Sequence, residues 1–214
     1  MNLTIPKEQI IVNLYNQIDA LFSITVEEKN ILLQYIDETL AKCEMCFTNT
    51  DNKYYVNNSM GGVKFNPFHS VQYMTFLYWL AHIIYVGNKG GLLCDKLYYL
   101  NKTMNGLDMF YAIEMPDKFS AEHPVGTVLG RAKYGNGFFF YQGCTVGGNH
   151  DKNGILHYPI IGKNVTMYAN SSIIGKCRIG DNVILGAGTL IKNEDIPNNT
   201  IVFGQSPNLI LKQK

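Results

Sequence analysis

The sequence carries little net charge, few cysteines and no strongly basic segment. Lys and Arg number 18 against 17 Asp and Glu, and no Lys/Arg-rich run occurs, so the charge gives no reason to expect nucleic acid or an acidic membrane as a partner. Five cysteines, an odd number without framework spacing, suit reduced thiols in the cytoplasm. The first twelve residues, with Lys7 and Glu8, lack the long apolar core of a signal peptide, so we expect a cytoplasmic protein.

Signatures of cofactors, metals and membrane insertion are also missing. No P-loop, dinucleotide glycine fingerprint or metal-ligand spacing occurs, and the pair Cys43 and Cys46 has no second pair, so we expect no metal site. The most apolar stretch, residues 66–88, is short of a membrane span and is interrupted by Gln72 and His82. We interpret it as a buried helix of a bundle and expect no membrane insertion.

Helical periodicity dominates the first hundred residues. Residues 6–22 place apolar side chains on one helical face, and Thr25 with Glu28 forms a capping-box pattern that predicts the start of a second helix. Residues 66–88 and 92–103 predict two more helices. The pattern therefore indicates an all-helical N-terminal domain over residues 1–106.

From residue 107 onward the dominant period is six. Long aliphatic side chains recur at this spacing, at Ile161, Met167, Ile173, Ile179, Leu185 and Ile191. Small or β-branched residues follow four positions later, at Val165, Ser171, Cys177, Val183 and Thr189. A period of six is typical of a chain wound into a triangular coil, with a short strand and a turn on each side. An ordinary β-domain with Gly-rich turns is the alternative, but such domains do not hold this register over such a length.

The same period continues towards the N-terminus. It predicts further axial residues at Val128, Tyr134, Phe140 and Val146. A polar, Gly-rich segment then breaks the period, which predicts a projecting loop at 148–159. The coils are expected to end near Asp195, before Pro197, and a C-terminal tail over 196–214 is expected to fold back along the last coils.

These hexads resemble those of the hexapeptide-repeat acyltransferases. The segments HSVQYMTFLYWLAH (69–82) and AIEMP (112–116) look like parts of serine acetyltransferases and of their relatives in polysaccharide biosynthesis clusters. The resemblance implies an α+β chain in which the helical domain precedes a left-handed parallel β-helix acyltransferase domain over 107–214. It also implies acetyl-CoA as cosubstrate and a homotrimer or a dimer of trimers.

The segment EHPVGTVLG (122–130) resembles the part of serine acetyltransferases that carries the catalytic histidine, and His123 and Gly126 match it. A neutral imidazole can accept the proton of an acceptor hydroxyl that attacks a thioester and can then protonate the departing thiolate. The resemblance assigns Glu114 as the carboxylate that orients this histidine. Glu114 precedes His123 by nine residues instead of the family's fifteen, so Asp117 and Glu122 remain competitors.

The projecting loop departs from the family. His157, Tyr158 and Pro159 stand where serine acetyltransferases have Arg-His-Pro, and the missing arginine weakens serine as acceptor and leaves room for a sugar hydroxyl. The candidate acceptor contacts are His150, His157 and Arg131.

For the donor, the resemblance implies a groove between two β-helices of a trimer, with small residues where the pantetheine arm lies close to the backbone. The candidate acetyl-CoA contacts are Tyr168, Ala169, Gly186, Ala187, Lys192 and Gly204.

Together these features predict an acetyl-CoA-dependent O-acetyltransferase that acts on a small-molecule acceptor, either L-serine-like or a sugar hydroxyl. An amino-sugar N-acetyltransferase and a non-catalytic β-helix scaffold are the alternatives.

Overall fold

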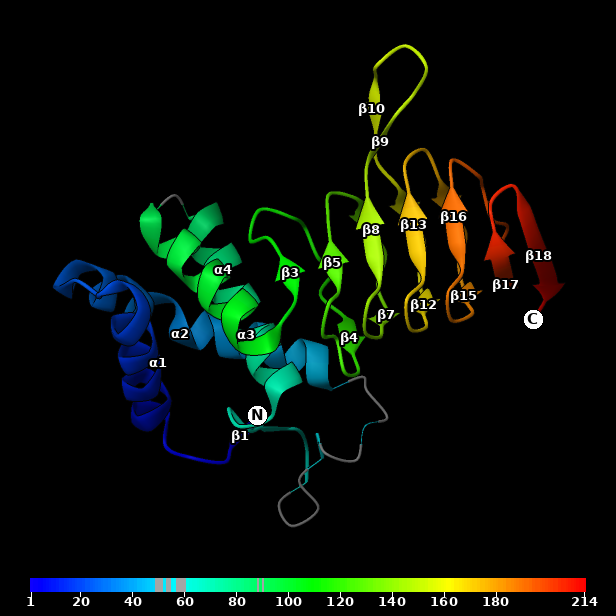
Figure 1. Cartoon of the computed structure of the whole chain (residues 1–214). Helices are drawn as coiled ribbons and strands as arrows, with labels where there is room; N and C mark the ends of the chain where they lie inside the picture. The colour runs from blue at the N-terminus through cyan, green and yellow to red at the C-terminus, as the bar shows by residue number, and fades with distance from the viewer. Residues whose placement is uncertain (49–51, 53–54, 57–60, 88, 90) are drawn as a thin grey trace. The chain divides into compact units, whose positions relative to one another are not determined.

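The computed structural model describes residues 1–48, 52, 55–56, 61–87, 89 and 91–214. The chain forms two compact units, Met1–Asn105 and Gly106–Lys214 (Figure 1). The first unit is helical and the second is built from short parallel strands, which confirms the predicted α+β class with helices ahead of a β-helix. Within the described residues, no helix combines the length and the apolar character that crossing a membrane requires.

Among the residues of the first unit that the structure describes, four helices make up most of the fold, together with one short parallel strand pair. The bounds are β1 Asn2–Leu3, α1 Lys7–Phe22, α2 Val26–Phe47, β2 Lys64–Phe65, α3 Ser70–Val86 and α4 Leu92–Asn105. The predicted capping box is present at the start of α2, because the Thr25 amide donates to Glu28 Oε2 (2.8 Å) and the Glu28 amide donates to Thr25 Oγ1 (3.1 Å).

Helix α3 is the buried helix of this unit, as the sequence predicts. It packs against both α2 and α4 and exposes little of its surface. Its buried Gln72 is fully paired: Oε1 accepts from the Asn66 amide at 2.7 Å and Nε2 donates to the Lys64 carbonyl at 2.9 Å. Cys43 and Cys46 are both buried, and burial raises the pKa of the Cys43 thiol, so their place in the described structure is the helical core.

The second unit is a parallel β-helix with three faces. One face contains β3, β5, β8, β13 and β16, another β4, β7, β12, β15 and β17, and a third β6, β11 and β14. The strands are β3 Asp108–Met109, β4 Phe119–Ala121, β5 Val128–Leu129, β6 Lys133–Tyr134, β7 Phe138–Phe140, β8 Thr145–Gly147, β9 Asn149–His150, β10 Leu156–His157, β11 Ile160–Ile161, β12 Thr166–Met167, β13 Ser172–Ile174, β14 Arg178–Ile179, β15 Ile184–Leu185, β16 Leu190–Lys192, β17 Thr200–Gln205 and β18 Asn208–Gln213.

The axial residues of the regular coils lie where the period of six predicts them. Ile161 pairs with Ile179, Met167 with Leu185 and Ile173 with Ile191, so each long side chain stacks on its counterpart one coil away. All six are buried, as are the small residues four positions after them. The earlier coils use aromatics for the same purpose: Phe138 and Phe140 stack at 5.6 Å between ring centroids, and all of Tyr134, Phe140 and Val146 are buried.

The prediction that Val128 is axial is wrong. Val128 is 42% exposed, whereas Leu129 is 1% exposed and pairs with Val146. The coil between Leu129 and Val146 is one residue shorter than the coil between Ile161 and Ile179. A single residue lost at a corner shifts the inward position by one, because successive strand residues point to opposite faces.

The prediction that the coils end near Asp195 is also wrong. Ile196 bridges Ile179 in parallel, and Val202 of β17 pairs with Leu185, so a further coil follows Pro197. Pro197 occupies an exposed corner, where the missing amide hydrogen removes no ladder bond. The tail then folds back as β18, which pairs antiparallel with β17.

Asparagines shape one corner of the β-helix. Asn164, Asn182 and Asn199 have φ values of 54°, 58° and 56°, a left-handed conformation that asparagine tolerates better than most residues. Their side chains form a ladder, with Asn164 Nδ2 donating to Asn182 Oδ1 (3.1 Å) and Asn182 Nδ2 donating to Asn199 Oδ1 (2.9 Å). The ladder links three successive coils.

The segment that interrupts the hexads is a β-hairpin. Strands β9 and β10 pair antiparallel, and the hairpin projects from the coils after β8 (Figure 1).

Candidate active site

His123 lies at a tight corner between β4 and β5. Its φ is 48°, and its carbonyl accepts a hydrogen bond from the Val125 amide at 2.7 Å, which closes a three-residue turn around Pro124. The residue before a proline normally prefers an extended backbone, so this conformation is unusual. The turn leaves the His123 side chain exposed, and an unusual backbone that displays a titratable side chain is a common feature of functional sites.

The same corner recurs on the coils that follow, and we call it the His123 corner. The strand register aligns Ala121 with Phe140, Phe140 with Met167, Met167 with Leu185, and Leu185 with Val202. The residue two positions after each of these aligned residues belongs to the column that forms this corner. The column is His123, Gln142, Ala169, Ala187 and Gly204. Backbone hydrogen bonds tie the column together, from the Asn170 amide to the Gln142 carbonyl and from the Gly188 amide to the Ala169 carbonyl, both 2.9 Å.

Five of the six candidate acetyl-CoA contacts therefore share a corner with His123. Ala169, Ala187 and Gly204 belong to the column itself, and Tyr168 and Gly186 precede two of its members. Gly204 has a φ of 84°, which a residue with a Cβ rarely adopts, so the chain can bend here. The structure thus brings a candidate base and small residues onto one edge of the β-helix.

The sixth candidate, Lys192, lies elsewhere. It ends β16, at the opposite end of that strand from Gly188, and its backbone amide donates to Ser206 Oγ at 2.9 Å. Arg131 follows β5, and the hairpin with His150 and His157 follows β8, at the same end of the same face. We call this second edge the hairpin corner. The predicted residues are therefore divided between two corners of one chain.

The hairpin is organised by Asp151. Its Oδ1 accepts from the amides of Asn153 (2.8 Å) and Ile155 (3.0 Å), and its Oδ2 lies 3.1 Å from His157 Nε2. The hydrogen bond to His157, followed by those from the two amides, lowers the pKa of the Asp151 carboxyl. His157 is held by this contact, while His150 is exposed on β9.

Comparison with known proteins shows what this chain resembles. Residues 158–193 match the family described as bacterial transferase hexapeptide (six repeats). A serine acetyltransferase of Staphylococcus epidermidis is 30% identical over 136 residues, which cover 63% of this chain and 62% of that protein. The chain therefore contains hexapeptide repeats and is similar to serine acetyltransferases over part of its length. A serine acetyltransferase of Synechococcus elongatus is 30% identical over 109 residues, covering 50% of this chain and 44% of that protein. The chain thus spans less than two thirds of the length of these relatives.

Solved structures extend the similarity of fold to both units of this serine acetyltransferase-like chain. Serine acetyltransferase of Neisseria gonorrhoeae has a TM-score of 0.74 at 20% identity, covering 96% of this chain and 78% of its own. A serine acetyltransferase in complex with CoA has a TM-score of 0.66 at 16% identity, covering 92% of this chain and 82% of its own. At these identities the match establishes the fold.

The acidic residue next to His123 in the sequence is Glu122, whose carboxylate lies beside Tyr141. Glu114 is exposed, and neither its side chain nor that of His123 has a hydrogen-bond or ion-pair partner among the described residues. Glu122 immediately precedes His123, and its amide donates to the Phe140 carbonyl at 3.1 Å, so its backbone is fixed by the next coil.

Sequence reasoning missed two aromatic residues at this corner. Tyr141 stacks on Tyr168 with ring centroids 5.1 Å apart and planes 13° apart, and the Phe203 ring lies where a side chain on Gly186 would be. Burial raises the pKa of Tyr141 to about 12, with a further contribution from the Glu122 carboxylate beside it. The sequence did contain a signal for Tyr141 and Phe203. Each directly follows an axial residue, a position where other coils have glycine, as at Gly162 and Gly180.

Proposed function

We propose that this chain is an acetyl-CoA-dependent O-acetyltransferase that uses His123 as general base. The observation that carries the proposal is the position of His123. It is an exposed imidazole at the head of a column that contains the small residues Ala169, Ala187 and Gly204, in a chain whose sequence and fold are similar to serine acetyltransferases.

The reaction needs one proton carrier and no covalent enzyme intermediate. The imidazole of His123 accepts the proton of the acceptor hydroxyl as its oxygen attacks the thioester carbonyl. The carbon–sulfur bond then breaks, and the imidazolium returns the proton to the departing thiolate. The products are an acetyl ester and free CoA, so atoms and charge balance. Its exposure keeps the ring accessible to both substrates.

The remainder of the His123 corner suits the donor. A thioester bound to a long, flexible arm needs backbone amides and carbonyls within reach, and side chains at Ala169, Ala187 and Gly204 are too small to block them. Tyr168 and Gly186 flank this track. We assign the acetyl-CoA arm to this column, and Lys192 at the hairpin corner to a phosphate of the cosubstrate.

The division between two corners supports assembly. Arg131, His150 and His157, the candidate acceptor contacts, lie at the hairpin corner, at the other end of the β5–β8–β13–β16 face from His123. Two copies packed side by side can place the His123 corner of one against the hairpin corner of the next. A closed ring of such contacts gives a homotrimer, or a dimer of trimers.

Three carboxylates, those of Glu114, Asp117 and Glu122, are candidates for orienting His123. Glu114 corresponds to the family residue by its sequence context, and Glu122 adjoins His123 in the chain. A carboxylate that holds one ring nitrogen fixes the tautomer and favours the imidazolium that forms during transfer. The variants Glu114→Gln, Asp117→Asn and Glu122→Gln separate the three, because only loss of the orienting group shifts the acidic limb of the pH–rate profile.

The acceptor is a small hydroxyl compound. The relatives named serine acetyltransferase support L-serine. The hairpin supports a sugar hydroxyl, because His157, which stands in place of the family's arginine, is hydrogen-bonded to Asp151 and offers no bidentate site for a carboxylate. We expect the reaction to take place in the cytoplasm.

A thiol-release assay tests the proposal. The intact chain is incubated with acetyl-CoA and, in turn, L-serine, neutral sugars and amino sugars. We expect acceptor-dependent release of CoA with at least one hydroxyl compound and a loss of about 10²–10⁴-fold in kcat for His123→Ala, the usual contribution of a general base. Lys163→Ala, on an exposed corner outside both groups of residues, is the matched control and should leave the rate unchanged.

Three outcomes would overturn the proposal. Release that requires an amino sugar and gives an amide would identify an N-acetyltransferase. Absence of transfer to every acceptor, or transfer unaffected by His123→Ala, would favour a β-helix scaffold or a different base.

A further inference from the structure

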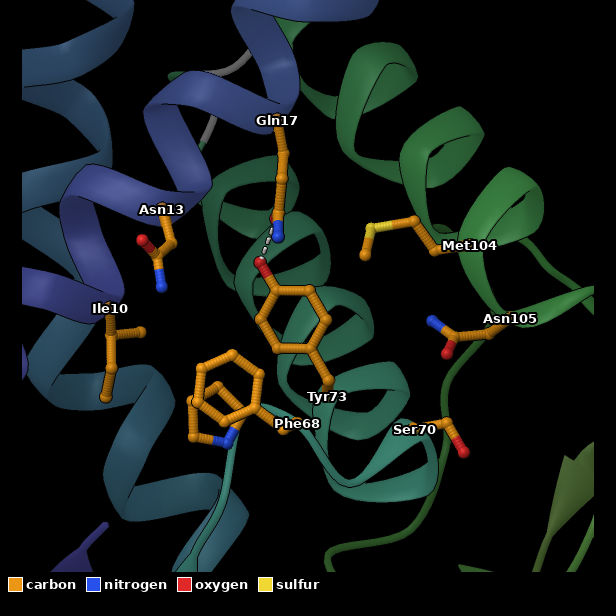
Figure 2. A pocket seen from close by; sticks show the side chains of 9 residues that line it. Ile10, Asn13, Gln17, Phe68, Ser70, Tyr73, Met104 and Asn105 are labelled. Carbon is orange, nitrogen blue, oxygen red and sulfur yellow. Dashed lines mark hydrogen bonds between the residues drawn. The ribbon is translucent and has the colours of Figure 1, made fainter. Parts of the chain in front are cut away.

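The helical unit contains a pocket of about 250 Å³ that the proposed acetyl transfer does not use (Figure 2). It lies between α1, α4 and the beginning of α3. Its lining residues all belong to the helical unit: Ile10, Asn13, Gln17, Pro67, Phe68, Ser70, Tyr73, Met104 and Asn105. Its volume is below the range of about 300–1,000 Å³ that is common for drug-sized ligands, so its occupant should be small.

The polar side chains of the pocket retain hydrogen-bonding capacity. The Tyr73 hydroxyl donates to Gln17 Oε1, as Figure 2 shows. Asn13 Oδ1 accepts from Gln9 Nε2, and Asn105 Nδ2 donates to Asn101 Oδ1, both at 2.9 Å. Within the described structure, these bonds leave the side-chain NH₂ groups of Asn13 and Gln17 as donors and the Asn105 Oδ1 as acceptor. The Ser70 hydroxyl adds a group that can do either.

None of the nine lining residues is charged. Burial raises the pKa of the Tyr73 phenol, so this hydroxyl also stays neutral at physiological pH. A phosphate, carboxylate or ammonium group entering the pocket would lose water without gaining an opposite charge. The lining therefore selects for neutral ligands whose groups both donate and accept hydrogen bonds.

Two large apolar side chains at the pocket remain exposed. Phe68 is 74% exposed although it lies two residues before the start of the buried helix α3, and Met104 is 46% exposed. Ile10 and Met104 add apolar surface to the same pocket. A flat apolar ring next to several amides fits a molecule with C–H groups on one face and hydroxyl groups around its edge, which is the chemistry of a pyranose.

We propose that this pocket binds a neutral pyranose sugar, with Phe68 under the ring and the amides of Asn13, Gln17 and Asn105 around its hydroxyl groups. The proposal is independent of the acetyl-transfer proposal, because it concerns binding in the helical unit and requires no catalysis. A free monosaccharide and the terminal sugar of a glycan share this chemistry.

Binding can be measured on the intact chain by isothermal titration calorimetry. The probes are glucose, galactose, N-acetylglucosamine and their methyl glycosides, with glucuronate and glucosamine as charged counterparts. We expect at least one neutral sugar to bind, and its charged counterpart to bind about tenfold more weakly or not at all, because a charge in an uncharged pocket loses solvation. A methyl glycoside that binds as well as the free sugar indicates a glycan-linked ligand, and loss of binding on methylation indicates a free sugar.

Phe68→Ala should weaken that binding about tenfold, while Val26→Ala, which removes an equally exposed side chain (75%) outside the pocket, should not. Both substitutions are on the surface and should leave the fold intact, which circular dichroism checks. His123→Ala should also leave this binding unchanged, which separates the pocket from a sugar bound as acceptor. The proposal is overturned if no neutral sugar binds, if a charged counterpart binds equally well, or if Phe68→Ala has no effect.

Discussion

His157 Nε2 lies 3.1 Å from Asp151 Oδ2, and this contact closes the hairpin β9–β10 near its base. The other oxygen of the same carboxylate accepts from two amides at the tip. One side chain therefore fixes both the turn and the histidine that we assign to acceptor binding. The hairpin is shaped by a charge, so its order should depend on pH.

The first prediction concerns acidification. The pKa of Asp151 is lower in the folded hairpin than its usual value, so the ionised carboxylate stabilises the hairpin above the usual Asp pKa of about 3.9. That contribution decreases as the pH falls below this value and is lost below the lowered folded pKa. We expect the amide resonances of Asn153 and Ile155 to shift towards disordered positions in this acidic window.

NMR spectra recorded from about pH 6 to about pH 2 test this expectation, because they begin above the usual Asp pKa of about 3.9 and continue well below it, where the lowered folded pKa lies. Asp151→Asn should show the loosened hairpin already at neutral pH, and residues of β13 on the neighbouring coil serve as internal reference. Hairpin amides that stay unchanged through the acidic range, or that are unaffected by Asp151→Asn, would contradict the role of the carboxylate.

The second prediction concerns the register of the first coil. Leu129 is buried against Val146, whereas Val128 points outward, so the two adjacent residues should respond very differently to truncation. Leu129→Ala should lower the free energy of unfolding by about 2–5 kcal/mol, the usual cost of a core Leu-to-Ala change. Val128→Ala should change it by about 0.5 kcal/mol or less, as most surface substitutions do.

Denaturant unfolding at a fixed protomer concentration provides the comparison, since oligomer stability depends on concentration. Equal losses for the two variants, or a larger loss for Val128→Ala, would show that the sequence-based register with Val128 on the axis is the correct one.

The regular coils could be predicted from the sequence, whereas the corners could not. Ile161 to Ile191 repeat without interruption, so the axial residues followed from counting alone. The shift of the axial position from Val128 to Leu129 arises at an irregular corner. The coil is one residue shorter there, and the composition of the segment does not reveal the missing residue. Pro197 indicated an end to the coils because it lacks an amide hydrogen, but at an exposed corner that hydrogen has no partner to lose.

The candidate site was predictable in part for a related reason. Residues identified by resemblance, such as His123 and Ala187, occupy one corner because hexads in register place equivalent positions above one another. The division between this corner and the hairpin corner follows from strand pairing, which is non-local. The stacking of Tyr141 on Tyr168 joins residues from different coils and has no signature in either segment.

The third prediction tests how closely neighbouring coils approach. A Cβ on Gly162 would lie 2.7 Å from the Gly180 carbonyl carbon of the next coil. Because that atom belongs to the backbone of a paired coil, it can move away only if the two coils separate. Gly162→Ala should therefore destabilise the β-helix by about 1–3 kcal/mol, the usual range for overpacking. A Cβ on Gly147 would meet only Ile174 Cδ1 at 3.7 Å, an ordinary contact.

Gly147→Ala is thus the matched control, and neither glycine has a positive φ that would add strain. Thermal unfolding of both variants at equal protein concentration makes the comparison. A melting temperature for Gly162→Ala equal to that of Gly147→Ala would show that the coils can separate at this corner without cost.

The fourth prediction assigns a kinetic role to Tyr168. Its ring stacks on Tyr141 and remains exposed at the edge where we place the acetyl-CoA arm, so Tyr168→Ala removes one wall of that track. Aromatic contacts contribute about 0.5–1.5 kcal/mol beyond simple burial, which corresponds to an increase of roughly two- to tenfold in the KM for acetyl-CoA.

The KM for the acceptor should stay unchanged, because the candidate acceptor contacts lie at the hairpin corner. Ile160→Ala is the matched control, since Ile160 is equally exposed on β11, outside the His123 corner. Steady-state kinetics with each substrate varied in turn separates the two constants. An increase confined to the acceptor KM would move Tyr168 from the donor track to the acceptor site, and an equal effect of Ile160→Ala would attribute the change to general loosening of the β-helix.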